Sequence, residues 1–207
     1  MSYTRTKRLV DLVLAVPALV ISLPIQAVVA GIIAKRLGRP VLFRQTRPGL
    51  TGRPFVLLKF RTMLPVDRAK GLIDDSSRMT DVGRRLRSSS FDELPSLWNV
   101  IRGDLSLVGP RPLLVEYLDR YTPEQGRRHD VKPGLTGLAQ IAGRNAVNWE
   151  QRLALDLDYV RHQSLRLDFK ILVSTISLLV RREGITAQGH PTMTKFLGTA
   201  THRGDAA

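Results

Sequence analysis

The segment LVDLVLAVPALVISLPIQAVVAGIIA, residues 9–34, decides how this chain is organised. It is twenty-six residues long, and Asp11 is its only charged side chain. As an unbroken helix it would be about 39 Å long at roughly 1.5 Å per residue, which exceeds the hydrocarbon core of a bilayer at about 30 Å. The segment is therefore predicted to enter a membrane.

Two features favour a re-entrant helix hairpin over a helix that crosses the membrane. Pro24, which follows Ser22, removes a backbone donor near the middle of the segment and clashes with the preceding turn. A crossing helix is expected to have more basic residues on its cytoplasmic side, but here they flank both ends. These residues are Arg5, Lys7, Arg8, Lys35, Arg36 and Arg39. We predict that the segment breaks at Ser22 and Pro24 and returns to the same face, with a straight crossing helix, a cleaved signal peptide and a buried helix as alternatives.

The composition of the whole chain indicates an anionic partner. Its 207 residues are 43% hydrophobic and 24% charged, which is typical of a folded protein and excludes a disordered chain. Thirty-two Lys and Arg against eighteen Asp and Glu give a net charge of +14, and twenty-five of the basic residues are Arg. Guanidinium groups suit nucleic acid, a phosphorylated small molecule or an anionic membrane. The absence of cysteine excludes disulfides and thiolate metal sites.

The remaining chain predicts a mostly helical α+β fold. Residues 41–63 predict a small β-hairpin, because VLFRQ and FVLLKFRTM are rich in strand formers and flank a Pro- and Gly-rich turn. Residues 64–90 predict a polar surface excursion, and helices are expected over 92–102, from Thr122 and after Asn148. The apolar run at 167–182 fits an amphipathic interfacial helix or a core helix equally well.

The sequence Ser90-Phe91-Asp92-Glu93 has a structural and a chemical interpretation. Ser90 and Glu93 match a capping box, but a helix capped at Ser90 would place Pro95 beyond the free donors of its first turn. A helix that begins at Asp92 fits the proline better and leaves both carboxylates at its amino end, where phosphates bind. A carboxylate in that position can attack phosphorus and hold a phosphoryl group.

Attack of a carboxylate on a phosphate needs cations that shield the two negative charges. A single Lys or Arg side chain, considered alone, is more typical of a solvated surface charge than of a phosphate-binding group. Arg111 is the best exception, because Pro110 and Pro112 stiffen the turn that carries it. The candidates are Lys59, Arg61, Arg87, Arg102, Arg111 and Arg144. The four histidines lack metal-ligand spacing, and no phosphate-loop or dinucleotide motif is present.

Several separated motifs resemble those of the bacterial sugar transferases, also called monotopic phosphoglycosyl transferases. The motifs are Lys7-Arg8, PVLFRQTRPG, FVLLKFRTM, SSSFDELPSLWNVIRGDLSLVGPRPLL, VKPGLTGLAQIAGRN and LDLDYV. They follow the family's order over nearly the whole chain, which resembles the minimal catalytic form, a polyprenyl-phosphate hexose-1-phosphate transferase. On this basis we divide the chain into a re-entrant membrane anchor at 1–38, a catalytic domain at 39–190 and a carboxyl-terminal tail at 191–207.

The resemblance implies transfer of a sugar-1-phosphate from a UDP-sugar to polyprenyl (undecaprenyl) phosphate, with release of UMP. This would be the first membrane step of exopolysaccharide, O-antigen or glycoprotein glycan synthesis. Asp92 would be the nucleophile, Glu93 its partner, and Mg²⁺ would lie against Asp92. The substrate-binding residues would be Lys59, Arg61, Arg87, Arg111, Pro112 and Arg144.

The same resemblance implies a place and a set of partners for the chain. It would lie on the cytoplasmic face of the bacterial inner membrane, among membrane lipids, and supply downstream glycosyltransferases; a homodimer is left open. Leu138 and Ala142 depart from many relatives, and residues 183–198 resemble members that act on acetamido sugars, so the sugar is not determined. The alternatives are a membrane-tethered nucleic-acid-binding protein and a non-catalytic scaffold. With 6% aromatic residues the chain has few rings for base stacking, so nucleic acid is not expected as a partner.

Overall fold

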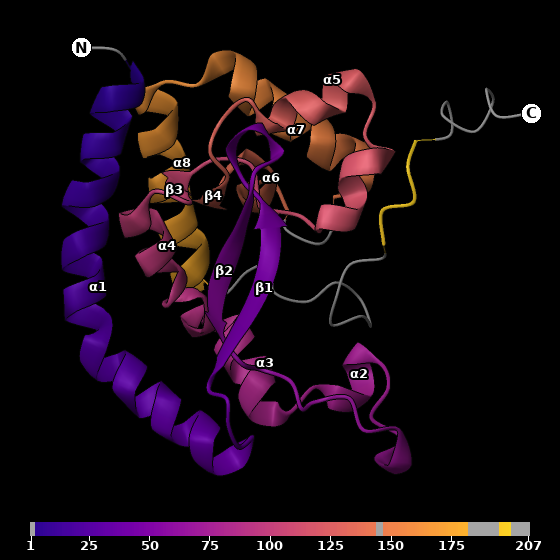
Figure 1. Cartoon of the computed structure of the whole chain (residues 1–207). Helices are drawn as coiled ribbons and strands as arrows, with labels where there is room; N and C mark the ends of the chain where they lie inside the picture. The colour runs from indigo at the N-terminus through magenta and orange to yellow at the C-terminus, as the bar shows by residue number, and fades with distance from the viewer. Residues whose placement is uncertain (1–2, 144–146, 182–194, 200–207) are drawn as a thin grey trace, which may run out of the picture.

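A computed structural model describes residues 3–143, 147–181 and 195–199 of the chain. A long helix, α1 (Tyr3–Arg36), runs along one side of a smaller domain (Figure 1). In that domain β1 (Leu42–Pro48) pairs with β2 (Pro54–Phe60) in an antiparallel hairpin, and β3 (Ser106–Val108) pairs in parallel with β4 (Gly134–Thr136). The other helices are α2 (Asp75–Arg78), α3 (Asp81–Ser88), α4 (Ser96–Arg102), α5 (Pro123–Gly126), α6 (Leu138–Ile141), α7 (Trp149–His162) and α8 (Leu165–Arg181). Short 3-10 turns are η1 (Leu50–Gly52), η2 (Arg68–Lys70), η3 (Phe91–Glu93), η4 (Val115–Arg120) and η5 (Arg127–His129).

Helix α1 is continuous but bent, as Figure 1 shows in its lower half. Pro17 and Pro24 both lie inside it, and each removes one helical hydrogen bond. The Ser22 hydroxyl donates to the Leu19 carbonyl at 2.9 Å and accepts from Gln26 at 2.9 Å. The predicted break at Ser22 and Pro24 is therefore a bend within one helix and not a turn between two separate arms.

One face of α1 packs on the domain along its whole length. Ala15 belongs to a core cluster with residues of α4 and β3, and Val29 and Ile33 belong to a second cluster near β2. The other face leaves many large apolar side chains exposed: Leu9, Val13, Leu14, Val16, Val20, Ile21, Leu23, Ile25, Val28 and Ile32. The helix is long and apolar enough to cross a membrane by length and composition alone. Such a continuous exposed apolar face is typical of a surface that meets lipid or a partner.

The amino-terminal half of α1 is tied to the domain by charged side chains. Arg8 donates to the backbone carbonyls of Val100 and Ile101 at 2.6 and 2.7 Å, at the carboxyl end of α4. Asp11 is buried, and its carboxylate accepts from the Ser106 hydroxyl of β3 at 2.9 Å. Because these groups satisfy one another inside the protein, this part of α1 belongs to the folded core.

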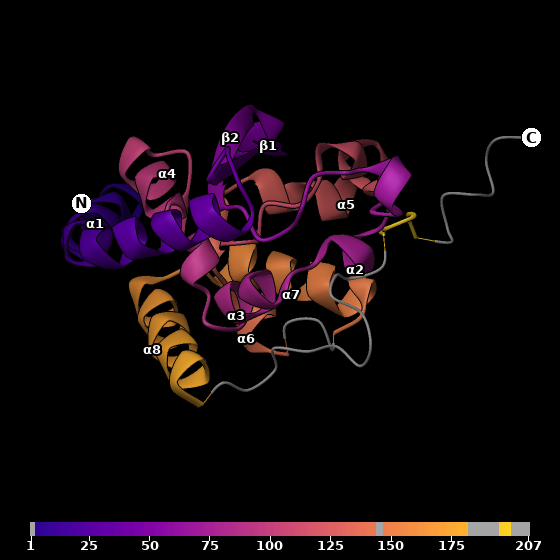
Figure 2. The same cartoon turned by 90° about the horizontal axis from the view of Figure 1, so that it is seen from below.

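Both ends of α1 contact the same domain. Near the amino end, the Lys7 ammonium lies 2.8 Å from the Asp168 carboxylate of α8. Near the carboxyl end, the Arg61 guanidinium donates to the carbonyls of Leu37 and Gly38, which are among the unpaired carbonyls left where a helix ends. Figures 1 and 2 both place α1 and α8 at the same end of the molecule.

Helix α4 pairs with the free edge of β2 through its side chains. Asn99 accepts from the Leu58 amide at 3.0 Å and donates to the Val56 carbonyl at 2.8 Å. The Ser96 hydroxyl donates to the Leu58 carbonyl at 2.6 Å. Ser96 and Asn99 are fully buried, so these bonds replace a third strand and fix Lys59, the next residue of β2, beside the start of α4.

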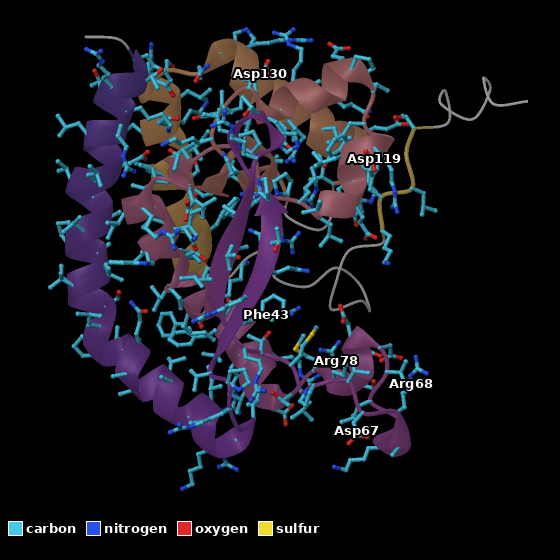
Figure 3. All side chains as sticks on the ribbon, in the orientation of Figure 1. Phe43, Asp67, Arg68, Arg78, Asp119 and Asp130 are labelled. Atoms are coloured by element: carbon cyan, nitrogen blue, oxygen red, sulfur yellow. The ribbon has the colours of Figure 1, made fainter. Side chains whose placement is uncertain are left out.

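Most of the local predictions are confirmed by the structure. The β-hairpin at 41–63 is present, Thr122 and Gln125 form a capping box, and Asn148 caps α7. The polar stretch at 64–90 forms short helices at the far end of the domain from the start of α1, where Asp67, Arg68 and Arg78 lie (Figure 3). Helix α8 buries Ile171 and exposes Phe169, Val173 and Ile176. One face of this helix therefore packs on the core, and the other face is apolar and exposed.

Candidate functional site

The two acidic residues singled out in the sequence lie in the 3-10 turn η3, between α3 and α4. Ser90 takes a left-handed conformation with φ of 57° and makes no side-chain cap, so the capping box does not form. Helix α4 begins only at Ser96, with Pro95 as its cap residue. The prediction of a helix from Asp92 is therefore wrong by four residues, because Pro95 lies ahead of the first turn of α4 rather than inside it.

The Glu93 carboxylate is held by two cations. Lys59 Nζ lies 2.5 Å and Arg111 Nη2 lies 2.7 Å from the same atom, Oε1. Burial by itself would raise the pKa of Glu93, but Arg111 and Lys59 outweigh it and hold the pKa below its usual range. Glu93 is therefore ionised at neutral pH and links β2 to the loop after β3.

The Asp92 carboxylate lies close to the same cations without being bonded to them. Its residue is 8% exposed, and within residues 3–143, 147–181 and 195–199 no hydrogen bond reaches its side chain. Burial and the charge of Glu93 raise its pKa from 3.8 to about 6, against the opposing pull of Lys59 and Arg87. Asp92 is thus a destabilised carboxylate that is not hydrogen-bonded to the described part of the chain, which suits a nucleophile.

Close backbone packing fixes the loop that carries Arg111. A Cβ atom at Gly109 would lie 2.4 Å from the Lys132 carbonyl, so only glycine fits between the ends of β3 and β4. The Arg128 guanidinium donates to the Arg111 carbonyl at 2.7 Å and pairs with the buried Asp156 of α7. This pair of charges, which the sequence analysis missed, locks the Arg111 loop onto α7.

The structure brings together six of the eight predicted catalytic and substrate-binding residues. Lys59, Asp92, Glu93 and Arg111 form one cluster, and the charge of Asp92 acts on Arg87, whose Nε donates to the Thr62 hydroxyl at 3.0 Å. Pro112 is buried beside Arg111. Arg61 is not part of the cluster, because its guanidinium is used at the end of α1. Arg144 lies outside the described residues.

The acidic pair offers a limited set of metal ligands. Among the residues that the structure describes, no group of three or more His, Asp and Glu side chains could hold an ion. Glu93 Oε1 is already bound by two cations, whereas no side chain in the described ranges is bonded to the Asp92 oxygens. Mg²⁺ in proteins commonly takes one or two carboxylates and completes its shell with water and substrate phosphates. Asp92 would therefore be the residue that holds a Mg²⁺ ion, with the remaining ligands supplied by water and substrate.

A buried acidic pair beside cationic side chains, together with a long helix that exposes an apolar face, is typical of a membrane-associated enzyme that acts on phosphate groups. The chain belongs to the bacterial sugar transferases, whose family model matches residues 2–182. It is a sugar-phosphate transferase enzyme.

Three relatives show how similar this chain is to other members of the family. It is 50% identical to the uncharacterized sugar transferase EpsL of Bacillus subtilis, over 93% of this chain and 96% of that protein. It is 43% identical to the UDP-glucose:undecaprenyl-phosphate glucose-1-phosphate transferase of Caulobacter vibrioides, over 84% of this chain and 69% of that protein. It is 36% identical to the undecaprenyl-phosphate galactose phosphotransferase of Salmonella typhimurium, over 86% of this chain but 41% of that protein.

Proposed function

We propose that this protein transfers a sugar-1-phosphate from a UDP-sugar to undecaprenyl phosphate through an aspartyl-phosphosugar intermediate, and releases UMP. The observation that carries the proposal is the buried Asp92 carboxylate, which accepts no hydrogen bond from the residues that the structure describes, next to a Glu93 held by Lys59 and Arg111. The relatives named for UDP-glucose and undecaprenyl phosphate support the two substrates. Because these relatives are named for glucose and for galactose, the sugar is not assigned.

The proposed reaction has two displacements at the β-phosphorus of the donor. In the first, an Asp92 oxygen bonds to phosphorus, and the bond to the oxygen bridging to UMP breaks, so UMP leaves with that electron pair. In the second, a phosphate oxygen of undecaprenyl phosphate bonds to the same phosphorus, and the Asp92 oxygen leaves. The product is a lipid diphosphate sugar, and Asp92 is regenerated as a carboxylate.

The neighbouring side chains supply charge and position. Arg111 and Arg87 offset the negative charge that builds up when one anion attacks another, and Lys59 keeps Glu93 ionised beside Asp92. We assign Glu93 to position the acceptor phosphate indirectly, through the Lys59 and Arg111 side chains that it holds. Bound Mg²⁺ would supply further charge neutralisation on the diphosphate.

We further propose that α1 enters and leaves the membrane on one face, the cytoplasmic face of the inner membrane. Both of its ends are bonded to the same domain, through Lys7 and Arg8 at one end and Arg61 at the other. A crossing helix would place those ends on opposite sides of the bilayer, about 30 Å apart, and would break one set of contacts. The exposed apolar faces of α1 and α8 would then rest in the lipid, with α8 as an interfacial helix.

The reaction is tested with purified full-length protein, magnesium, undecaprenyl phosphate and a panel of UDP-sugars. We expect release of UMP and formation of a lipid-linked diphosphate sugar with at least one donor of the panel. A panel of UDP-glucose, UDP-galactose and UDP-acetamido sugars also identifies the sugar. Absence of UMP release with all donors, from protein shown to be folded, would contradict the proposal.

The rate is expected to depend on pH through Asp92. Because its pKa is raised to about 6, the attacking carboxylate forms only as the pH rises through that value. We expect kcat/KM for the donor to rise about tenfold per pH unit below pH 6 and to level off above pH 7. Steady-state rates between pH 4.5 and 8.5, corrected for inactivation, measure this profile. A flat profile down to pH 4.5 would show that Asp92 has an ordinary pKa.

The membrane topology is tested by labelling single cysteines, since the chain contains none of its own. Thr4→Cys and Arg39→Cys place exposed thiols just outside the two ends of the apolar segment. An impermeant maleimide should label both in inside-out vesicles and neither in intact spheroplasts. Labelling of the two positions from opposite sides would show that α1 crosses the bilayer.

A further inference from the structure

The carboxyl-terminal segment 195–199 lies against the domain. Figure 3 shows this segment, drawn in yellow, beside Asp119 of η4. Phe196 is 3% exposed, whereas its neighbour Leu197 is 73% exposed. The segment therefore packs on the domain through the side chain of Phe196.

Phe196 contacts three other aromatic rings, and we call the four residues the aromatic cluster. Its ring centre lies 5.3 Å from that of Trp149 in α7. It lies 5.7 Å from the ring centres of Tyr117, in η4, and Tyr121, which follows η4. The rings of Tyr117 and Trp149 also contact each other edge to face at 5.5 Å. Because Phe196 touches all three rings, its removal would take away their shared contact.

Polar contacts hold the segment at and beyond Phe196. The Arg120 guanidinium donates to the Phe196 carbonyl. The Gln125 side-chain amide donates to the Thr199 hydroxyl at 3.0 Å. These directional bonds fix the position of the segment along η4 and the start of α5, which apolar packing alone would not do.

Contacts from the aromatic cluster lead to Arg111 in two ways. The Arg128 guanidinium lies over the Tyr121 ring, 5.7 Å from its centre, and donates to the Arg111 carbonyl at 2.7 Å. Leu113, two residues after Arg111, belongs with Phe196 to one buried apolar cluster. Phe196 is therefore connected to the loop that carries Arg111 through Tyr121 and Arg128 and also through Leu113.

The rest of the core does not depend on this segment. Two other core clusters pack α1 on α4, β2 and β3, and among the described residues they contain none beyond α8. Loss of the Phe196 side chain should therefore release the segment and loosen the aromatic cluster, while these two clusters stay folded.

We infer that Phe196 is a positioning residue, which holds the Arg111 guanidinium where it binds a phosphate group of a substrate. The inference rests on the proposed function, because that function supplies the phosphates. The Arg111 side chain is 36% exposed, so a ligand can reach it. A loop already held in one arrangement loses less conformational freedom when a ligand binds, so it binds more tightly. The phosphates of the nucleotide and of the lipid acceptor share the required chemistry.

Packing of the segment is measured by the fluorescence of Trp149. The chain has two tryptophans, so a Trp98→Phe protein reports on Trp149 alone. In that background, Phe196→Ala should shift the emission maximum to longer wavelength, because Trp149 loses a neighbouring ring and becomes more exposed to water. The matched control is Leu197→Ala, which changes the exposed neighbouring side chain and should leave the spectrum unchanged.

Binding of UMP and of farnesyl phosphate to the same full-length proteins is measured by calorimetry in detergent, at a temperature at which each protein is fully folded. Phe196→Ala should weaken the binding of at least one ligand about tenfold, and Leu197→Ala should change both affinities less than about twofold. Loss for UMP assigns Arg111 to the donor, and loss for farnesyl phosphate assigns it to the acceptor. A role in stability alone would lower the melting temperature of Phe196→Ala and leave both affinities unchanged.

Unchanged affinity of Phe196→Ala for both ligands, or no binding of either by the unaltered protein, would overturn the inference. So would a loss of affinity without a change in Trp149 fluorescence, because Phe196 would then act by another route. If Phe196→Ala does not fold, Phe196→Leu carries the same test with an expected loss of about threefold, because it leaves a smaller cavity.

Binding is measured without turnover. A protein whose affinity for UMP depends on Phe196, but which releases no UMP from any UDP-sugar, would contradict the proposed reaction while leaving this inference in place.

Discussion

Asp92→Asn is expected to abolish UMP release while making the protein more stable. The amide has the shape of the carboxylate but cannot bond to phosphorus as a nucleophile, so the rate should fall on the order of 10³-fold or more. The charge of Asp92 is unfavourable in the folded protein, since its pKa is raised to about 6. Removing that charge should raise the free energy of unfolding by about 1–2 kcal/mol at pH 7.5.

The stability gained by Asp92→Asn is expected to depend on pH, because the unfavourable charge is present only when Asp92 is ionised. Above pH 6 the folded protein carries an ionised Asp92 and bears the full cost, and this cost falls with pH until it is lost below the ordinary pKa of 3.8. The gain from Asp92→Asn should therefore be largest at pH 7.5 and clearly smaller at pH 4.5. Melting temperatures at the two pH values, together with UMP release, measure both effects in one protein preparation.

The control for Asp92→Asn is Asp81→Asn, which changes a carboxylate exposed on the surface of α3. It should leave UMP release within twofold of the unaltered protein. Labelled donor should leave a covalent phosphosugar on the unaltered protein and on the control, and none on Asp92→Asn. Activity of Asp92→Asn within tenfold of the unaltered protein would remove Asp92 from the role of nucleophile.

Asp156→Ala is expected to have the largest effect on stability. It leaves Arg128, whose side chain is 2% exposed, without the carboxylate that accepts two of its hydrogen bonds. An unpaired buried charge of this kind costs about 3–5 kcal/mol. In a chain of this length that loss lowers the melting temperature by at least about 6 °C.

The matched control is Asp158→Ala on the same helix. The Asp158 side chain is 54% exposed and pairs with His162 one turn away, so its loss should cost less than about 0.5 kcal/mol. Unfolding in urea, followed by circular dichroism in detergent, compares the two variants. The double change Arg128→Met with Asp156→Leu should recover most of the lost stability, because it removes both charges together. Equal stability of Asp156→Ala and Asp158→Ala would mean that Arg128 finds another partner.

Local features of this fold were predictable because their causes lie within a few residues. The turn at Pro48 to Pro54 predicts the hairpin, and Thr122 and Asn148 predict two helix starts. The bend in α1 follows from Pro17 and Pro24. The rule for helix caps did not hold at Ser90, whose backbone is left-handed and whose side chain forms no cap.

The sequence by itself determined the apolar segment and the acidic pair, because each consists of neighbouring residues. It also determined the family, because the motifs of the family follow one another in a fixed order. Only the tertiary structure decided which cations contact Glu93. It also showed that Arg61 binds the carbonyls at the end of α1 and not the acidic pair, and that Arg128 and Asp156 hold the Arg111 loop. The physical reason is that electrostatic partners act through space over a few ångströms, whereas their separation along the chain can be any length.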